Sequence, residues 1–268
     1  MEKIKKISLE ELKEIQLNIL NYVSEFCSNH HIHYWLDSGT LLGAIRHKGY
    51  IPWDDDIDIG MLRPDYDCFI KEFNKHSKKY KCYCIENNDV FCYPYAKVLD
   101  TDTVLYEPDR NGKKLCVNLD IFVYDNAPES NQIVKRMFDI RDLYYKLNIL
   151  HTYHNVPNGK WYRKWAIYII RFLLLPFPQN FFCKKTVQNS KKYADKQTRR
   201  VGNFTSVTRA VCERSVFDSF IEVDFEGGKY PAPYGYDKWL KVFYGDYMVL
   251  PSEEKRVSHH TFEAYHLD

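Results

Sequence analysis

The sequence predicts an α+β fold, because segments with the alternating pattern of β-strands gather in its first half and helical patterns fill much of its second half. A chain of 268 residues with 45% hydrophobic residues is long enough for one large core or a core with a smaller appendage. We expect a mixed β-sheet core flanked by helices in residues 1–128, a helical insertion in residues 129–200, and a C-terminal part in residues 201–268 that packs back on the core.

The first segment is typical of an amphipathic helix and not of a secretory signal, because no uninterrupted apolar stretch follows its basic residues. Ser8 and Glu11 have the spacing of a capping box. The apolar positions that recur at helical spacing are Leu12, Ile15, Ile19, Val23 and Phe26. We therefore expect a cytoplasmic protein, and in that reducing compartment its eight cysteines should be free thiols.

The elements of the first half are short. A buried strand at 34–37 should lead into a Ser-Gly-Thr turn and a helical segment at 41–46. A strand at 56–62 and a helix over 63–80 should follow. Further strands are expected at 81–86, 93–99, 103–106 and 115–124.

The second half is expected to be mainly helical from residue 130 to about 196. The tail should contain one or two strands, a turn at Gly227-Gly228, and a helix over 237–244 that ends at Gly245. Lys and Arg number 38 against 36 Asp and Glu, which gives a formal net charge of only +2. We therefore expect no nucleic-acid partner.

The stretch IPWDDDIDIGML, residues 51–62, contains four aspartates within five positions. Like charges this close repel one another, so their proximity requires an explanation. On a strand, Asp56 and Asp58 would project from one face, roughly 6–7 Å apart by strand rise, while the neighbouring isoleucines enter the core. Two such carboxylates can share a divalent cation, and all-oxygen ligands favour Mg²⁺ or Mn²⁺.

A second strand pattern, CVNLDIFVYD, supplies a third candidate ligand. Its alternate positions are apolar, and Asp120 lies on the opposite face. Upstream, Gly39 allows a tight turn with close backbone approach, and Thr40 can cap the following helix. The N-terminus of that helix suits an anionic phosphate.

Each feature has an ordinary structural explanation when taken alone. A Ser-Gly-Thr triplet before a helix is often only a capped turn, an aspartate run is often a solvated loop, and Asp120 could be a sheet-edge residue. Their order is more informative: a glycine turn, about fifteen residues, Asp-Ile-Asp-Ile, and then a lone Asp within a strand. Together they favour metal-dependent phosphate chemistry.

This order of residues resembles the DNA-polymerase-beta-like nucleotidyltransferase superfamily, whose members carry a Gly-Ser or Gly-Thr turn, an Asp-x-Asp pair and a later acidic residue. The longer stretch GTLLGAIRHKGYIPWDDDIDIGMLRPDY resembles the LicD-type phosphocholine transferases, a family that includes the fukutin-related proteins. NLDIFVYD and YDKWLKVFYGDYMVLPSEEKR are similar to later segments of the same family. The resemblance therefore extends from residue 34 to about residue 256.

The resemblance implies a nucleotidyltransferase-like core and a phosphotransferase reaction. The expected donor is CDP-choline or a similar CDP-alcohol. The expected acceptor is a hydroxyl of a cell-surface glycan of the teichoic acid or lipopolysaccharide type, linked to lipid, and CMP is the expected leaving group. Three alternatives stay open: transfer of another polyol phosphate, nucleotidyl transfer from a nucleoside triphosphate, and a non-catalytic glycan- or choline-binding module.

The resemblance also implies roles for individual residues. Asp56, Asp58 and Asp120 are expected to be catalytic and to hold one or two Mg²⁺ or Mn²⁺ ions, with Asp120 as general base. Asp54 and Asp55 are expected to act indirectly or to stabilise the loop. The expected substrate-binding residues at the phosphate turn are Ser38, Gly39 and Thr40. Arg46 and Lys97 are expected as substrate-binding cations because of their position relative to these motifs, not because of the resemblance.

Two apolar segments leave alternatives open. The aromatic residues Tyr230, Tyr234, Tyr236 and Trp239 could form a box for a quaternary ammonium group or could pack in the core. Residues 161–185 are too short and too interrupted to span a bilayer, which needs about 20 apolar residues. They could form an interfacial helix on the inner face of the cell membrane or a buried core helix with basic ends.

Overall fold

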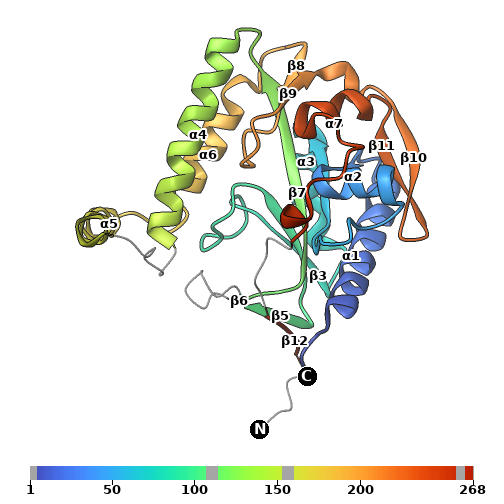
Figure 1. Ribbon diagram of the computed structural model, residues 1–268, viewed down its shortest axis with the longest axis horizontal. Helices are drawn as coiled ribbons and strands as arrows, with labels where there is room; N and C mark the ends of the chain where they lie inside the picture. Colours follow the sequence, from blue (N-terminus) through green and yellow to red (C-terminus); the bar gives the residue numbers. More distant parts are fainter. Residues whose placement is uncertain (1–4, 107–113, 153–159, 258–262, 268) are drawn as a thin grey trace.

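A mixed β-sheet lies at the centre of the protein, as the α+β prediction requires (Figure 1). The computed structural model describes residues 5–106, 114–152, 160–257 and 263–267. The strands follow the order β1-β2-β7-β4-β3, and β8 pairs with both β7 and β9. Their bounds are β1 Trp35–Leu36, β2 Asp58–Leu62, β3 Tyr80–Tyr83, β4 Ala96–Asp100, β7 Asn118–Ala127, β8 Arg200–Gly202 and β9 Val211–Glu213.

The central pair, β2 and β7, is parallel, whereas the other pairs in this sheet are antiparallel. Ile59, Met61 and Ile121 are fully buried, because helices cover the strands. Nearly continuous apolar sequence of this kind is expected where a strand is buried on both faces. The parallel pairing brings the first residues of both strands to one edge of the sheet.

Helices α1 (Leu9–Asn29) and α3 (Arg63–Glu72) pack on the central strands, and α2 (Ser38–His47) packs against β2. Ser8 caps α1 by accepting the amide proton of Glu11 at 3.2 Å. Glu11 is the second member of the expected capping box. Its carboxylate contacts Lys5 at 2.9 Å and His266 at 3.0 Å.

The C-terminal part shares the hydrophobic core of the first half. Its hairpin, β10 (Phe220–Phe225) and β11 (Gly228–Pro233), and helix α7 (Tyr236–Tyr244) confirm the expected elements. Gly245 ends α7 with φ +65°, a conformation that favours glycine. Trp239 of α7 is fully buried against Tyr124 of β7. A separate three-stranded sheet contains β5 (Thr103–Tyr106), β6 (Lys114–Leu115) and β12 (Glu263–His266).

Several predicted boundaries are wrong by a few residues. Strand β2 begins at Asp58 and not at residue 56, because the acidic run belongs to a turn in which the Asp54 amide donates to the Ile51 carbonyl at 2.8 Å. Helix α3 ends at Glu72 and continues only as a 3₁₀ turn, Phe73–Lys75. Strand β4 begins at Ala96, and the expected strand at 115–124 is two strands, β6 and β7.

The segment after β7 is helical, as expected, with α4 (Asn131–Thr152), α5 (Trp161–Leu174) and α6 (Phe181–Ser190). Helices α4 and α6 pack side by side, and α5 lies beyond the lower end of α4 at the margin of the molecule (Figure 1). Within the described ranges, none of the helices combines the length and apolar character needed to cross a membrane. All eight cysteines are free thiols, which confirms that expectation.

Candidate active site

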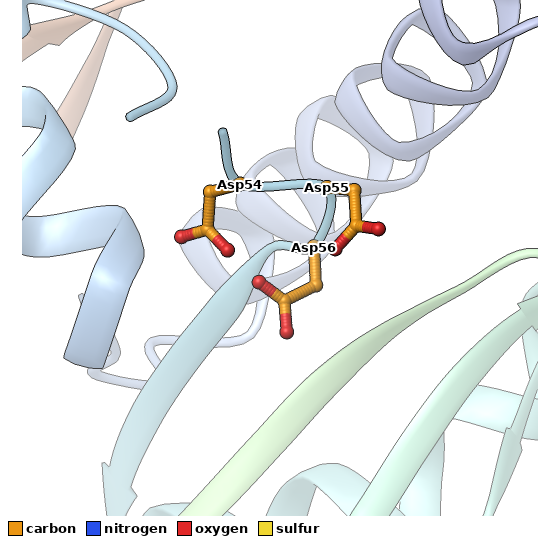
Figure 2. A group of neighbouring side chains, drawn as sticks. All are labelled: Asp54, Asp55 and Asp56. Carbon is orange, nitrogen blue, oxygen red and sulfur yellow. The ribbon is translucent and has the colours of Figure 1, made fainter. Parts of the chain in front are cut away.

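The acidic run follows a turn at residues 51–54 in the loop between α2 and β2, and we call this loop segment the acidic turn. Figure 2 shows the side chains of Asp54, Asp55 and Asp56 leaving this turn in different directions. One carboxylate oxygen of each lies within 4.8 Å of the others. Asp54 and Asp56 line a cavity of about 920 Å³, whereas the buried Asp55 lines a smaller one beside the start of α1.

Asp58 and Asp120 lie directly opposite each other on the parallel strands β2 and β7. The Asp120 amide donates to the Ile57 carbonyl at 3.0 Å, and the Asp58 amide donates to the Thr40 hydroxyl at 2.8 Å. Asp58 is buried and lines the same cavity as Asp54 and Asp56. The structure thus brings the three predicted acidic residues together, although Asp56 reaches this position from the turn and not from the strand.

Burial and mutual repulsion destabilise the charged forms of these carboxylates. Burial raises the pKa of Asp58 well above its usual range, and the negative charges of Asp56 and Asp120 raise it further. Tyr244 is 41% exposed, but its hydroxyl lies among the same charges, and desolvation of that hydroxyl together with the neighbouring carboxylates raises the pKa of Tyr244 also. The cavity therefore has a strongly negative potential on the side of β2.

Lys97 is the cation nearest to Asp120. Its ammonium lies 2.5 Å from Asp120 Oδ1 and 2.9 Å from Asn118 Oδ1, and its side chain is buried beneath the rings of Tyr93 and Tyr95. Lys97 lies on β4, which pairs with β7, and the pairing places it directly opposite Asp120. Lys97, which was predicted to bind a substrate phosphate, is thus the ion-pair partner of Asp120.

The start of α2 lies against the acidic turn. Ser38 and Gly39 line the large cavity, and Ser38 has a left-handed backbone, φ +47°, which is strained for a residue other than glycine. A Cβ atom on Gly39 would lie 2.5 Å from Asp54 Oδ2, so glycine is required here for close approach. The expected cap at Thr40 is wrong: α2 begins at Ser38, and the Thr40 hydroxyl instead accepts from Asp58.

Arg46, at the other end of α2, lines the cavity and is fixed in place. Its Nη1 donates to the Tyr247 carbonyl at 2.8 Å and its Nε donates to His47 Nε2 at 2.9 Å. Lys255 also lines the cavity, and its place in the family-like segment YDKWLKVFYGDYMVLPSEEKR was the only sequence signal for it. Both cations lie where they can offset negative charge on a bound phosphate.

Of the two alternatives for the aromatic cluster at 230–239, the structure favours core packing for two members and places none of the four at the cavity. Tyr230 and Trp239 are buried in the core, and none of the four proposed residues lines the cavity. Tyr234 is 72% exposed. The aromatic residues that do line the cavity are Trp53, Phe122, Phe243, Tyr244 and Tyr247. The four-residue cluster was conspicuous only because its members are close in sequence, whereas the cavity gathers its rings from three separate segments.

Asp37, which the sequence did not single out, holds the site together. Its fully buried carboxylate accepts the Tyr124 hydroxyl proton and the Trp239 Nε1 proton, the latter at 3.0 Å. Burial raises the pKa of Asp37. Because its own amide donates to the Asp58 carbonyl at 3.0 Å, Asp37 connects β2, β7 and α7. The sequence feature that could have identified Asp37 is its position at the end of the largely apolar stretch HYWLD.

The donor set fits a divalent cation. Asp54, Asp56 and Asp58 present carboxylates to one cavity, and Asp120 lies one strand away. These charges disfavour one another strongly enough to raise the pKa of Asp58, and a bound cation would reverse that repulsion. Oxygen ligands of this kind suit Mg²⁺ or Mn²⁺ better than zinc.

We predict that Asp58→Asn stabilises the metal-free protein at neutral pH. The change removes a buried charge, and each unit by which a folded-state pKa is raised corresponds to about 1.4 kcal/mol, so the free energy of unfolding should rise by at least about 1 kcal/mol. Wild-type stability should fall as pH increases from about 4, because the folded state then binds more protons than the unfolded state. Urea unfolding in EDTA across pH 4–8 measures both effects.

The exposed Asp218→Asn serves as the matched control and should leave both quantities unchanged. Adding Mn²⁺ at pH 7 should stabilise the wild type and Asp218→Asn but not Asp58→Asn. A destabilised Asp58→Asn variant, or one stabilised by Mn²⁺ as strongly as the wild type, would contradict the assignment of Asp58.

We predict that Gly39→Ala weakens Mn²⁺ binding at least tenfold while the fold persists. The new methyl group displaces only the end of the Asp54 side chain, which can rotate. In Gly43→Ala the new methyl group would meet the Gly49 carbonyl at 2.4 Å, so that variant should instead be destabilised. Calorimetric Mn²⁺ titration and urea unfolding of the two variants distinguish these effects. Equal Mn²⁺ affinity in Gly39→Ala and the wild type would exclude Asp54 from the cation site.

Comparison with known proteins identifies the family. The model of the LicD/FKTN/FKRP nucleotidyltransferase domain matches residues 31–161. The lipopolysaccharide cholinephosphotransferase LicD of Haemophilus influenzae is 32% identical over 98% of this chain and 99% of its own length. Human ribitol 5-phosphate transferase FKRP is 53% identical over 34 residues, which are 13% of this chain and 7% of that protein. An uncharacterised Rickettsia prowazekii protein is 30% identical over 67% of each chain.

The H. influenzae similarity extends over nearly the whole of both chains, and the matched domain contains the acidic turn, β2 and β7. The chain belongs to the LicD family.

Proposed function

We propose that this protein transfers phosphocholine from CDP-choline to a hydroxyl of a cell-surface glycan and releases CMP. The observation that carries the proposal is the set of carboxylates from the acidic turn and β2 that line one large cavity beside the start of α2. The full-length similarity to a lipopolysaccharide cholinephosphotransferase supports the choice of reaction. Acidic residues at one edge of a mixed sheet also fit the nucleotidyltransferase-like architecture that we propose for the core.

Asp56, Asp58 and Asp120 would hold one or two Mg²⁺ or Mn²⁺ ions, and we add Asp54 as a candidate ligand because it shares the cavity. When bound, the cations would neutralise charge on the pyrophosphate of the donor and on the departing CMP. The unpaired backbone N–H groups at an α-helix N-terminus favour anions, so Ser38 and Gly39 are placed to bind a donor phosphate.

Side chains of the protein would bind the donor and take the proton of the acceptor. Arg46, held by the Tyr247 carbonyl, faces the cavity and would bind the negative charge of the donor. We assign Asp120 as the general base that takes the proton of the acceptor hydroxyl. Lys97 orients that carboxylate by engaging Oδ1, so its role differs from direct phosphate binding.

The direct test is release of CMP from CDP-choline in the presence of Mg²⁺ and purified lipopolysaccharide or teichoic acid. The wild type and Asp218→Asn should release CMP and label the acceptor with choline. Asp58→Asn and Asp120→Asn should lose at least a hundredfold in kcat, because they remove groups that act on the reacting phosphate. Near-normal turnover by Asp58→Asn would refute the mechanism.

Transfer of another alcohol phosphate is the alternative that a specific observation favours, since this chain is also similar, over 34 residues, to a ribitol 5-phosphate transferase of the same family. A panel of CDP-choline, CDP-ribitol and CDP-glycerol in the same assay separates the two, because the preferred donor has the highest kcat/KM. Pyrophosphate release from CTP would instead indicate nucleotidyl transfer.

We predict that Tyr244 contacts the quaternary ammonium of choline. Its ring lies beside the carboxylates in the cavity, and an aromatic face attracts a cation by about 0.5–2 kcal/mol. Tyr244→Ala should raise KM for CDP-choline by roughly threefold to thirtyfold, whereas Tyr244→Phe, which keeps the ring, should not. Steady-state kinetics with the exposed Tyr234→Ala as control test this assignment. An unchanged KM in Tyr244→Ala would exclude it.

A further inference from the structure

Helix α5 exposes its apolar stripe to solvent. Along α5 the large exposed side chains recur three and four residues apart, which places them on one face of the helix. They are Trp161, Trp165, Tyr168, Ile169, Phe172 and Leu173. Trp161 and Phe172 are 74% and 72% exposed. An amphipathic helix in a soluble protein normally turns this face toward the core, so the orientation of α5 is reversed.

The opposite face of α5 fixes this orientation. Leu174 is buried, and Arg171 Nε donates to the Leu150 carbonyl near the end of α4 at 3.1 Å. Helix α5 packs on α4, and it lies at the edge of the molecule in Figure 1. The apolar stripe is therefore held outward, and Leu175 and Phe177 extend it beyond the end of the helix.

The charge pattern indicates what covers this stripe. Residues 160–185 contain six Lys and Arg residues and no Asp or Glu. Arg163 and Lys164 lie within the first turn of α5, next to the tryptophans. Indole and phenol rings prefer the boundary between lipid and water, and basic side chains are attracted to anionic headgroups. A second copy of this chain would bring the same positive charges together, which opposes self-association through this face.

We propose that the outward face of α5 lies on an anionic lipid membrane, with the tryptophan, phenylalanine and leucine side chains at the level of the headgroups. The helix is too short to span a bilayer, so the contact is peripheral. The lipid-linked nature of the acceptor is part of the proposed function and adds support, but the geometry of α5 carries the inference without it.

The test is co-sedimentation of the full chain with vesicles of phosphatidylcholine, with and without 30% phosphatidylglycerol. The wild type should bind the anionic vesicles at least tenfold more tightly than the neutral ones, and 0.5 M NaCl should reduce this difference. Trp165→Ser/Phe172→Ser should lose binding at least tenfold. Arg163→Glu/Lys164→Glu should lose the preference for anionic lipid.

Leu9→Ser is the matched control, because Leu9 is half-exposed on α1, at the opposite side of the molecule from α5. It should bind vesicles as the wild type does. Vesicle binding does not depend on turnover, so CMP release from CDP-choline with a delipidated acceptor tests the proposed function separately. Equal vesicle binding by Trp165→Ser/Phe172→Ser and the wild type would overturn the inference. So would a dimeric wild type that becomes monomeric in that variant, because a second copy would then cover the stripe.

Discussion

Repulsion among carboxylates is the constraint on which the site depends. The parallel pairing of β2 with β7 sets Asp58 opposite Asp120, and the preceding turn adds Asp54 and Asp56. A buried aspartate beside other aspartates favours its neutral form, so this arrangement opposes folding at neutral pH until a cation is bound. This electrostatic cost is the physical argument for the proposed cation site, and the cavity beside the carboxylates is where we propose that a phosphate substrate enters.

Asp37 explains how the fold maintains this arrangement. Its carboxylate accepts hydrogen bonds from the Tyr124 hydroxyl of β7 and the Trp239 indole N–H of α7, while its amide donates to the Asp58 carbonyl of β2. A buried carboxylate without partners would be strongly destabilising, but hydrogen bonds to charged groups contribute about 1.5–3 kcal/mol each. The strained Ser38 follows immediately, so the same anchor fixes the start of α2 against the acidic turn. The C-terminal helix is therefore part of the site, although it lies about 200 residues further along the chain.

The sequence was sufficient to predict the elements and the acidic residues, but not how the cavity closes. Periodicity and glycine positions located α1, α7 and the β10–β11 hairpin, because these depend on local signals. The pairing of Asp58 with Asp120 followed from two strand patterns. The predicted strand at 56–62 begins two residues too early, since the alternation includes Asp56 and Ile57 and tertiary hydrogen bonds decide where β2 begins. The positions of the cavity-lining Lys255 and Tyr244 depend on long-range packing, and the sequence indicated them only through the family-like segment that contains both.

The helical segment connects α5 to the cavity. Ser206, Val207 and Thr208 line the cavity, and the loop that carries them is attached to α4: Arg141 Nη1 donates to the Thr208 carbonyl at 3.3 Å, and Phe138 packs against Phe204. Helix α5 is attached to the far end of α4 through Arg171. These three contacts connect α5 to the cavity wall through α4. If α5 lies on a membrane, α4 sets the distance between the lipid surface and the cavity. For the proposed acceptor, a lipid-linked glycan, that distance would determine which hydroxyls can reach the carboxylates.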